Sequence, residues 1–147
     1  MDEIIACLEQ KVLLLTKIWN LTKQIEVRCT QQEVELDQFL ELRGIYIDRV
    51  KKCNSLIQKL AKNLPAEQQE HLARLLQPDA IQDDQCGSDE ERKILKLSRD
   101  CADILQKAGA LDQIARETLQ KQCTELQEKI NQLRKDEKGQ NIYRNIN

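Results

Sequence analysis

The side chains best suited to chemistry are six cysteines and one histidine, and their spacing favours neither catalysis nor metal binding. The cysteines are widely separated, and no Cys-x-x-Cys pair occurs. Structural zinc sites usually draw their Cys and His ligands from closely spaced pairs, which this chain lacks. We therefore expect reduced thiols that serve as small hydrophobic side chains. These are Cys7, Cys29, Cys53, Cys86, Cys101 and Cys123.

The single histidine, His71, completes no catalytic or metal-binding motif. A di-iron helical bundle would need Glu three residues before it, where this chain has Gln68. No Gly-rich phosphate-binding loop occurs. Carboxylates alternate with Lys and Arg, as on solvated helix surfaces. We expect a solvent-facing His71, no cofactor and no enzymatic activity.

Composition and charge favour a helical, cytoplasmic protein. The 147 residues include only four Gly and two Pro, so turns are few and elements long. The net charge of −2 argues against general nucleic-acid binding. The apolar run 12–19 contains Lys17, so we expect no membrane span. No basic n-region of a signal peptide precedes it, hence the expected cytoplasmic location.

Hydrophobic spacing predicts an all-α fold in a single domain that spans residues 1–147. We expect an antiparallel bundle of three long helices plus a short helix, with coiled-coil-like packing. The predicted helices cover about 2–29, 31–62, 65–76 and 89–136. An acidic loop at 77–88 and a C-terminal tail at 137–147 complete the prediction.

The second helix carries an unusually wide apolar face. On a helical wheel, its large hydrophobic residues cover roughly 160°, whereas a helix with one neighbour needs a stripe of about 100°. This helix must therefore pack against two neighbours. Arg43 interrupts its seam, and we expect it to extend its charge outward while its stem packs. Gly44 indicates either a close helix approach or a weak position in the helix.

Local motifs suggest where the helices begin and end. Thr30 and Glu33 match a capping box, as do Ser88 and Glu91, so helices should begin after Thr30 and after Ser88. Pro65 should start the short helix. The acidic loop is interpreted as a solvated, mobile connection or as a docking tag for a basic partner.

The last long helix is predicted to overhang the others. At roughly 70 Å it exceeds the preceding long helix, at about 48 Å. Gly139 should end it, with a tail that frays or folds back onto the bundle. Its apolar seam advances mostly by alternating three and four residues and consists of Ile94, Leu97, Cys101, Ile104, Ala108, Leu111, Ala115, Leu119, Gln122, Leu126, Ile130 and Leu133.

Three stretches resemble flagellar export chaperones of the FlgN and FliT types. Residues 8–27, LEQKVLLLTKIWNLTKQIEV, resemble their first helix. Residues 34–56 resemble the second helix, including its hydrophobic-Asp-Arg-hydrophobic step at 47–50. Residues 130–147 resemble the C-terminal end, where basic residues and a glycine precede a tyrosine. Gly44 and the acidic loop have no counterpart in this pattern, which leaves the subfamily open.

The resemblance implies a cytosolic chaperone that binds the C-terminal helical segment of hook-associated proteins, those of the hook-filament junction or the filament cap. Binding would block premature assembly and help delivery to the export apparatus, with export-gate or export ATPase components as further partners. The family binds its clients largely through the C-terminal half of the chaperone.

Hydrophobic patterning is compatible with that role, because surplus apolar surface would accommodate an amphipathic partner helix. The same residues would otherwise close a homodimer or pack inside the monomer. A structural coiled-coil scaffold and a regulatory protein that sequesters a transcription factor are the alternative functions. The expected partner-binding residues are Leu119, Cys123, Leu126, Ile130 and Leu133, with Tyr143 secondary.

Overall fold

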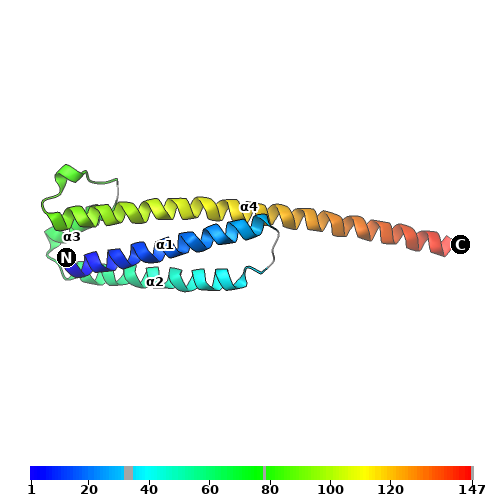
Figure 1. The fold of residues 1–147 in the computed structure, drawn as a ribbon, viewed down its shortest axis with the longest axis horizontal. Coiled ribbons are helices and arrows are strands. Elements are labelled where there is room, and N and C mark those ends of the chain that lie inside the picture. The colour runs from blue at the N-terminus through cyan, green and yellow to red at the C-terminus, as the bar shows by residue number, and fades with distance from the viewer. Residues whose placement is uncertain (32–34, 78, 147) are drawn as a thin grey trace.

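The structure is a computed structural model that describes residues 1–31, 35–77 and 79–146, with side chains as far as Gly139. The described residues form four α-helices and one 3-10 helix, and none of them lies in a strand. Consecutive long helices run in opposite directions (Figure 1). This arrangement confirms the predicted all-α bundle. The elements are α1 (Asp2–Thr30), α2 (Asp37–Lys62), α3 (Ala66–Leu75), η1 (Asp83–Gln85) and α4 (Asp89–Ile146).

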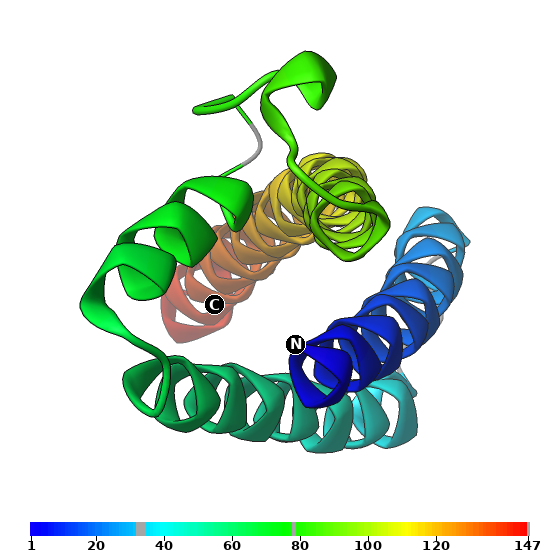
Figure 2. The same ribbon diagram turned by 90° about the vertical axis from the view of Figure 1, so that its left-hand side faces the viewer.

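Helix α1 is the centre of the bundle. It packs along both α2 and α4, whereas α2 and α4 have little direct contact. The short α3 closes one end between α2 and the start of α4 (Figure 2). Apolar residues of α1 are buried along its whole length, but only Ile57 is buried within α2. The wide apolar face of α2 is therefore only partly covered.

Three clusters of buried residues follow one another along the bundle. The largest joins all four α-helices at the α3 end, the second lies in the middle between α1 and α4, and the third lies where α1 ends. The fully enclosed side chains of the largest cluster include Ile4, Leu72, Leu75, Ile94 and Leu95.

The first helix boundary differs from its prediction. Thr30 is the last residue of α1 and not an N-cap, because its hydroxyl donates a hydrogen bond to the carbonyl of Glu26, 3.0 Å away. Helix α2 begins at Asp37, and Leu36 occupies its N-cap position. Glu33, the other half of the predicted capping box, lies outside the described residues.

Half of the predicted capping box before α4 is present, because the Glu91 carboxylate caps the residue before Ser88 and not Ser88 itself. The Glu91 backbone N–H donates to the Ser88 hydroxyl at 3.2 Å, and the Glu91 carboxylate accepts the backbone N–H of Gly87. His71 Nε2 lies 3.1 Å from the same carboxylate, so α3 and α4 are tied together here. The His71 side chain is 35% exposed and contacts Glu91, so its prediction as a solvent-facing residue is confirmed only in part.

The acidic loop is anchored to the bundle on both sides of η1. Ile81 and Cys86 are buried in the largest core cluster. Arg99 of α4 pairs with the Asp83 carboxylate and also donates to the Ile81 carbonyl. Interpretation of the whole loop as a solvated connection was therefore wrong for these residues. Pro78, which lies in the predicted loop, is outside the described part.

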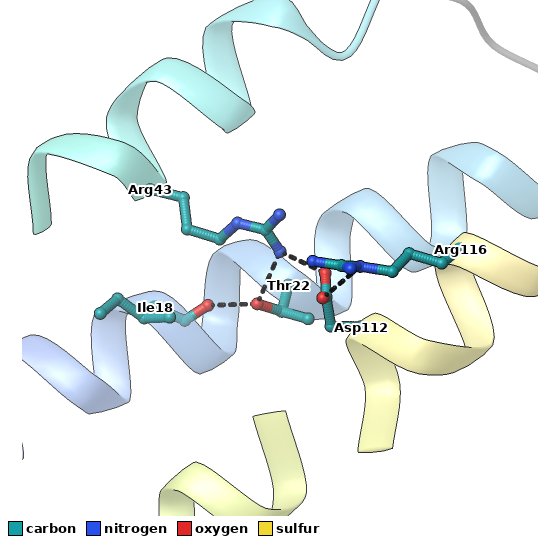
Figure 3. Close-up of polar contacts among 5 residues, drawn as sticks. All are labelled: Ile18, Thr22, Arg43, Asp112 and Arg116. Atoms are coloured by element: carbon teal, nitrogen blue, oxygen red, sulfur yellow. Dashed lines mark hydrogen bonds and ion pairs between the residues drawn. The ribbon is translucent and has the colours of Figure 1, made fainter. Parts of the chain in front are cut away.

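Arg43 does not extend its charge outward. Its guanidinium donates to Asp112 Oδ1 at 2.9 Å and to the Thr22 hydroxyl at 3.4 Å, so it links α2, α1 and α4 (Figure 3). Thr22 in turn donates to the Ile18 carbonyl, and Arg116 pairs with the other carboxylate oxygen of Asp112. The Arg43 side chain is only 17% exposed. The interruption in the predicted seam is therefore a polar connection across the bundle.

Helix α4 continues through the predicted tail. It runs over 58 residues without ending at Gly139, and its C-terminal part extends away from the other helices (Figure 1). The separate tail at 137–147 was thus wrong as far as Ile146. The predicted overhang is confirmed and is longer than expected, because a single glycine costs only about 1 kcal/mol in a helix.

Candidate protein-binding surface

The predicted partner-binding residues lie on the overhanging part of α4, and none of those described is buried. We call Leu119, Cys123, Leu126, Ile130 and Leu133 the α4 strip. Leu126 is 59% exposed and Leu133 is 67% exposed, values typical of side chains with no neighbour from another element. The side chain of Tyr143 lies outside the described residues. The structure therefore brings five of the six predicted residues onto one helix surface.

The α4 strip continues the seam that packs α4 into the bundle. Ala108 and Ala115 on this seam are buried, and Ala115 packs in one cluster with Ile25 and Cys29 of α1. Gln122 lies near the end of the part of α4 that contacts α1, and its side-chain amide donates to the Cys29 carbonyl at 2.7 Å. Every described side chain from Cys123 to Gly139 is exposed. The same seam is thus covered where α1 runs beside it and bare where α1 has ended.

A bare heptad strip is an incomplete coiled coil. Its members are separated by four, three, four and three residues, the spacing that faces a second helix. Over 14 residue steps the strip extends about 21 Å along the helix. Side-chain bonds within α4, such as Gln127 to Asn131 at 3.1 Å, support the helix but leave the strip uncovered. The arrangement can bind another amphipathic helix by burying these side chains.

A groove on the bundle was not predicted from the sequence. It has a volume of 280 Å³ and lies where α2 and α4 diverge across α1. Ser98 of α4 lines it, and the buried Ser98 hydroxyl has no hydrogen-bond partner among the described residues. An apolar groove of 260 Å³ between α2 and α3 shares lining residues with the first. The only signal in the sequence was the excess apolar width of α2. The first groove is lined by Leu8, Lys11, Asn54, Ile57, Gln58, Leu76, Ser98 and Cys101.

The cysteines are free thiols and lie apart from the α4 strip, except Cys123. Burial raises the pKa of Cys7, Cys29 and Cys101, so these three remain protonated at neutral pH. No group of three potential metal ligands occurs among the residues that the structure describes. None of the described helices is long and apolar enough to cross a bilayer.

Comparisons with protein-family models, with curated proteins and with solved structures find no match to this chain.

Proposed function

We propose that this chain is a cytoplasmic flagellar export chaperone of the FlgN or FliT type. The α4 strip would bind the C-terminal helical segment of a hook-associated protein, prevent its premature assembly and aid its delivery to the export apparatus. The observation that carries this proposal is the exposed heptad strip on a helix that extends beyond its own bundle. The resemblance of residues 8–27, 34–56 and 130–147 to these chaperones supports the identity of the client.

The shape of the molecule suits capture of a helix. The bundle buries its own core without help from the overhang, so the strip is available to a partner. A client helix would cover five apolar side chains over about 21 Å, or roughly two heptads. Such a contact is short enough for a reversible complex, as delivery of the client requires.

The test is co-elution with peptides that cover the C-terminal helical segments of hook-associated proteins, followed by titration calorimetry. We expect a one-to-one complex, and we expect Leu126→Asp to weaken it about a hundredfold, because a carboxylate would be buried in an apolar contact. The melting temperature should change by no more than about 2 °C, since Leu126 is mostly exposed.

Thr124→Asp is the matched control, because it adds the same charge two residues away on an exposed position outside the strip. It should leave the affinity within about twofold. If the Leu126→Asp variant instead fails to fold, Leu126 is a core residue and not a partner-binding one. A stable oligomer that ignores the peptides would favour the scaffold alternative.

A further inference from the structure

The residues beside the α4 strip are basic or neutral. In a two-helix coiled coil, the positions that flank the apolar seam face the partner and select it by charge. Here the flanking positions from residue 120 to residue 134 hold no carboxylate. They are Gln120, Gln122, Gln127, Lys129 and Arg134.

The two cationic residues on these flanks form no ion pair with a described carboxylate, although Glu125 lies one helical turn before Lys129. Lys129 and Arg134 are exposed, and no ion pair joins either to a carboxylate within the described part of the chain. Glu125 and Glu128 of the same segment lie at positions directed away from the seam. The nearest flanking acid, Asp136, lies beyond Leu133 and accepts the Gln132 side-chain amide at 3.4 Å.

Charge also disfavours a second copy of this chain as the partner. If two overhangs paired in parallel, Lys129 of each would face Arg134 of the other. If they paired antiparallel with the strips fully overlapped, the two Lys129 side chains would face each other. Neither arrangement provides an attractive pair between charged flanking residues, and like charges at such positions weaken unwanted pairings.

We infer that the α4 strip selects an amphipathic partner helix whose apolar heptad seam is flanked by Asp or Glu. The carboxylates would lie opposite Lys129 and Arg134, and Glu137 at the next seam position would end the contact. This inference rests on the proposed binding role of the strip, but specifies its partner by charge. It also makes the chain a receptor for a foreign helix and not for itself.

The test uses two synthetic three-heptad peptides with Leu and Ile at the seam. They are identical except that every flanking position is Glu in one peptide and Lys in the other. Binding to the full chain is measured by fluorescence anisotropy at 50 mM and 300 mM NaCl. We expect the Glu peptide to bind at least about tenfold more tightly at low salt, and the ratio to shrink at high salt because the pairs are exposed.

Charge reversal then assigns the preference to the named residues. The double variant Lys129→Glu with Arg134→Glu should bind the Lys peptide more tightly than the Glu peptide. The control double variant Lys121→Glu with Lys135→Glu changes positions away from the seam and should still prefer the Glu peptide. Equal binding of both peptides, or dimerisation of the free chain through the strip in sedimentation, would overturn the inference. Failure of both peptides together with no effect of Leu126→Asp on client binding would instead overturn the proposed function.

Discussion

At the residue scale, Gly44 is a weak position in α2 and not a point of close approach. A Cβ built there meets no atom within 4 Å, so the first of the two interpretations of this glycine is wrong. Gly44→Ala should raise the free energy of unfolding by about 0.5–1 kcal/mol, because alanine loses less backbone entropy in a helix. Urea denaturation checks this, with Gly109→Ala as a second open helical site. Destabilisation by either change would contradict the geometry.

Glu91 should make the stability of the α3–α4 junction depend on pH. The Gly87 backbone N–H, and after it the contact with His71, lower the pKa of this carboxyl below its ordinary value of 4.5. A lowered folded-state pKa gives stability that is fully present above pH 4.5 and is lost as pH falls through the folded value.

Glu91→Gln should therefore cost about 1 kcal/mol at neutral pH, the size of a lost helix cap. The difference from the unmodified chain should shrink at acid pH, as measured by urea denaturation at several pH values. Glu90→Gln, at an exposed neighbouring position, is the control. A difference that stays constant down to pH 2 would show that the charge of Glu91 has no part in the effect.

At the scale of elements, the Arg43–Asp112 pair holds α2 to the rest of the bundle. Because Ile57 is the only buried residue of α2, we expect this ion pair to contribute more to the free energy of unfolding than a surface ion pair does. Asp112→Ala should destabilise by about 1–2 kcal/mol, since it leaves a largely buried guanidinium without its carboxylate. Arg43→Leu should cost less, because Asp112 keeps Arg116 and the leucine packs in the seam.

Chemical denaturation of both variants measures this order, with Asp103→Ala as the control. Asp103 pairs with Lys107 on an exposed helix surface, and its loss should cost under about 0.5 kcal/mol. If Asp112→Ala costs no more than this control, the pair does not support α2.

Helix content and packing faces could be predicted from the sequence, but not all helix ends. The heptad spacing identified the seams because helices bury every third or fourth residue. The helix start predicted from the capping box at Thr30 was wrong. A threonine hydroxyl can equally donate a hydrogen bond to the carbonyl four residues back, as Thr30 does to Glu26. The helix end predicted at Gly139 was wrong, because one glycine costs little free energy compared with the many backbone hydrogen bonds of a long helix.

At the scale of the molecule, the difference in helix length creates the candidate site. Helix α1 has 29 residues, α2 has 26 and α4 has 58, so roughly two fifths of α4, residues 123–146, extend beyond the other helices (Figure 1). Sequence spacing could predict the members of the α4 strip and the overhang. It could not show that Leu119 to Leu133 are bare, because identical spacing at Ala108 and Ala115 is covered. Coverage depends on where other helices end, which is a property of the whole fold.

Removal of the overhang should separate folding from binding. A chain that ends after Gln122 keeps the three buried clusters and the bond from Gln122 to Cys29, and loses only described side chains that are exposed. Its melting temperature should stay within about 3 °C of the full chain, while circular dichroism should show the loss of the 24 helical residues 123–146. Binding of hook-associated peptides should fall below detection in calorimetry.

The internal control for this truncation is a chain that ends after Gly139, which keeps the whole strip but lacks Tyr143. It should bind as the full chain does if the five described strip residues are sufficient. A truncation after Gln122 that unfolds would show that the overhang stabilises the bundle. A truncated chain that still binds would indicate that the client lies in the groove between α2 and α4, where the Ser98 hydroxyl has no partner within the described part of the chain.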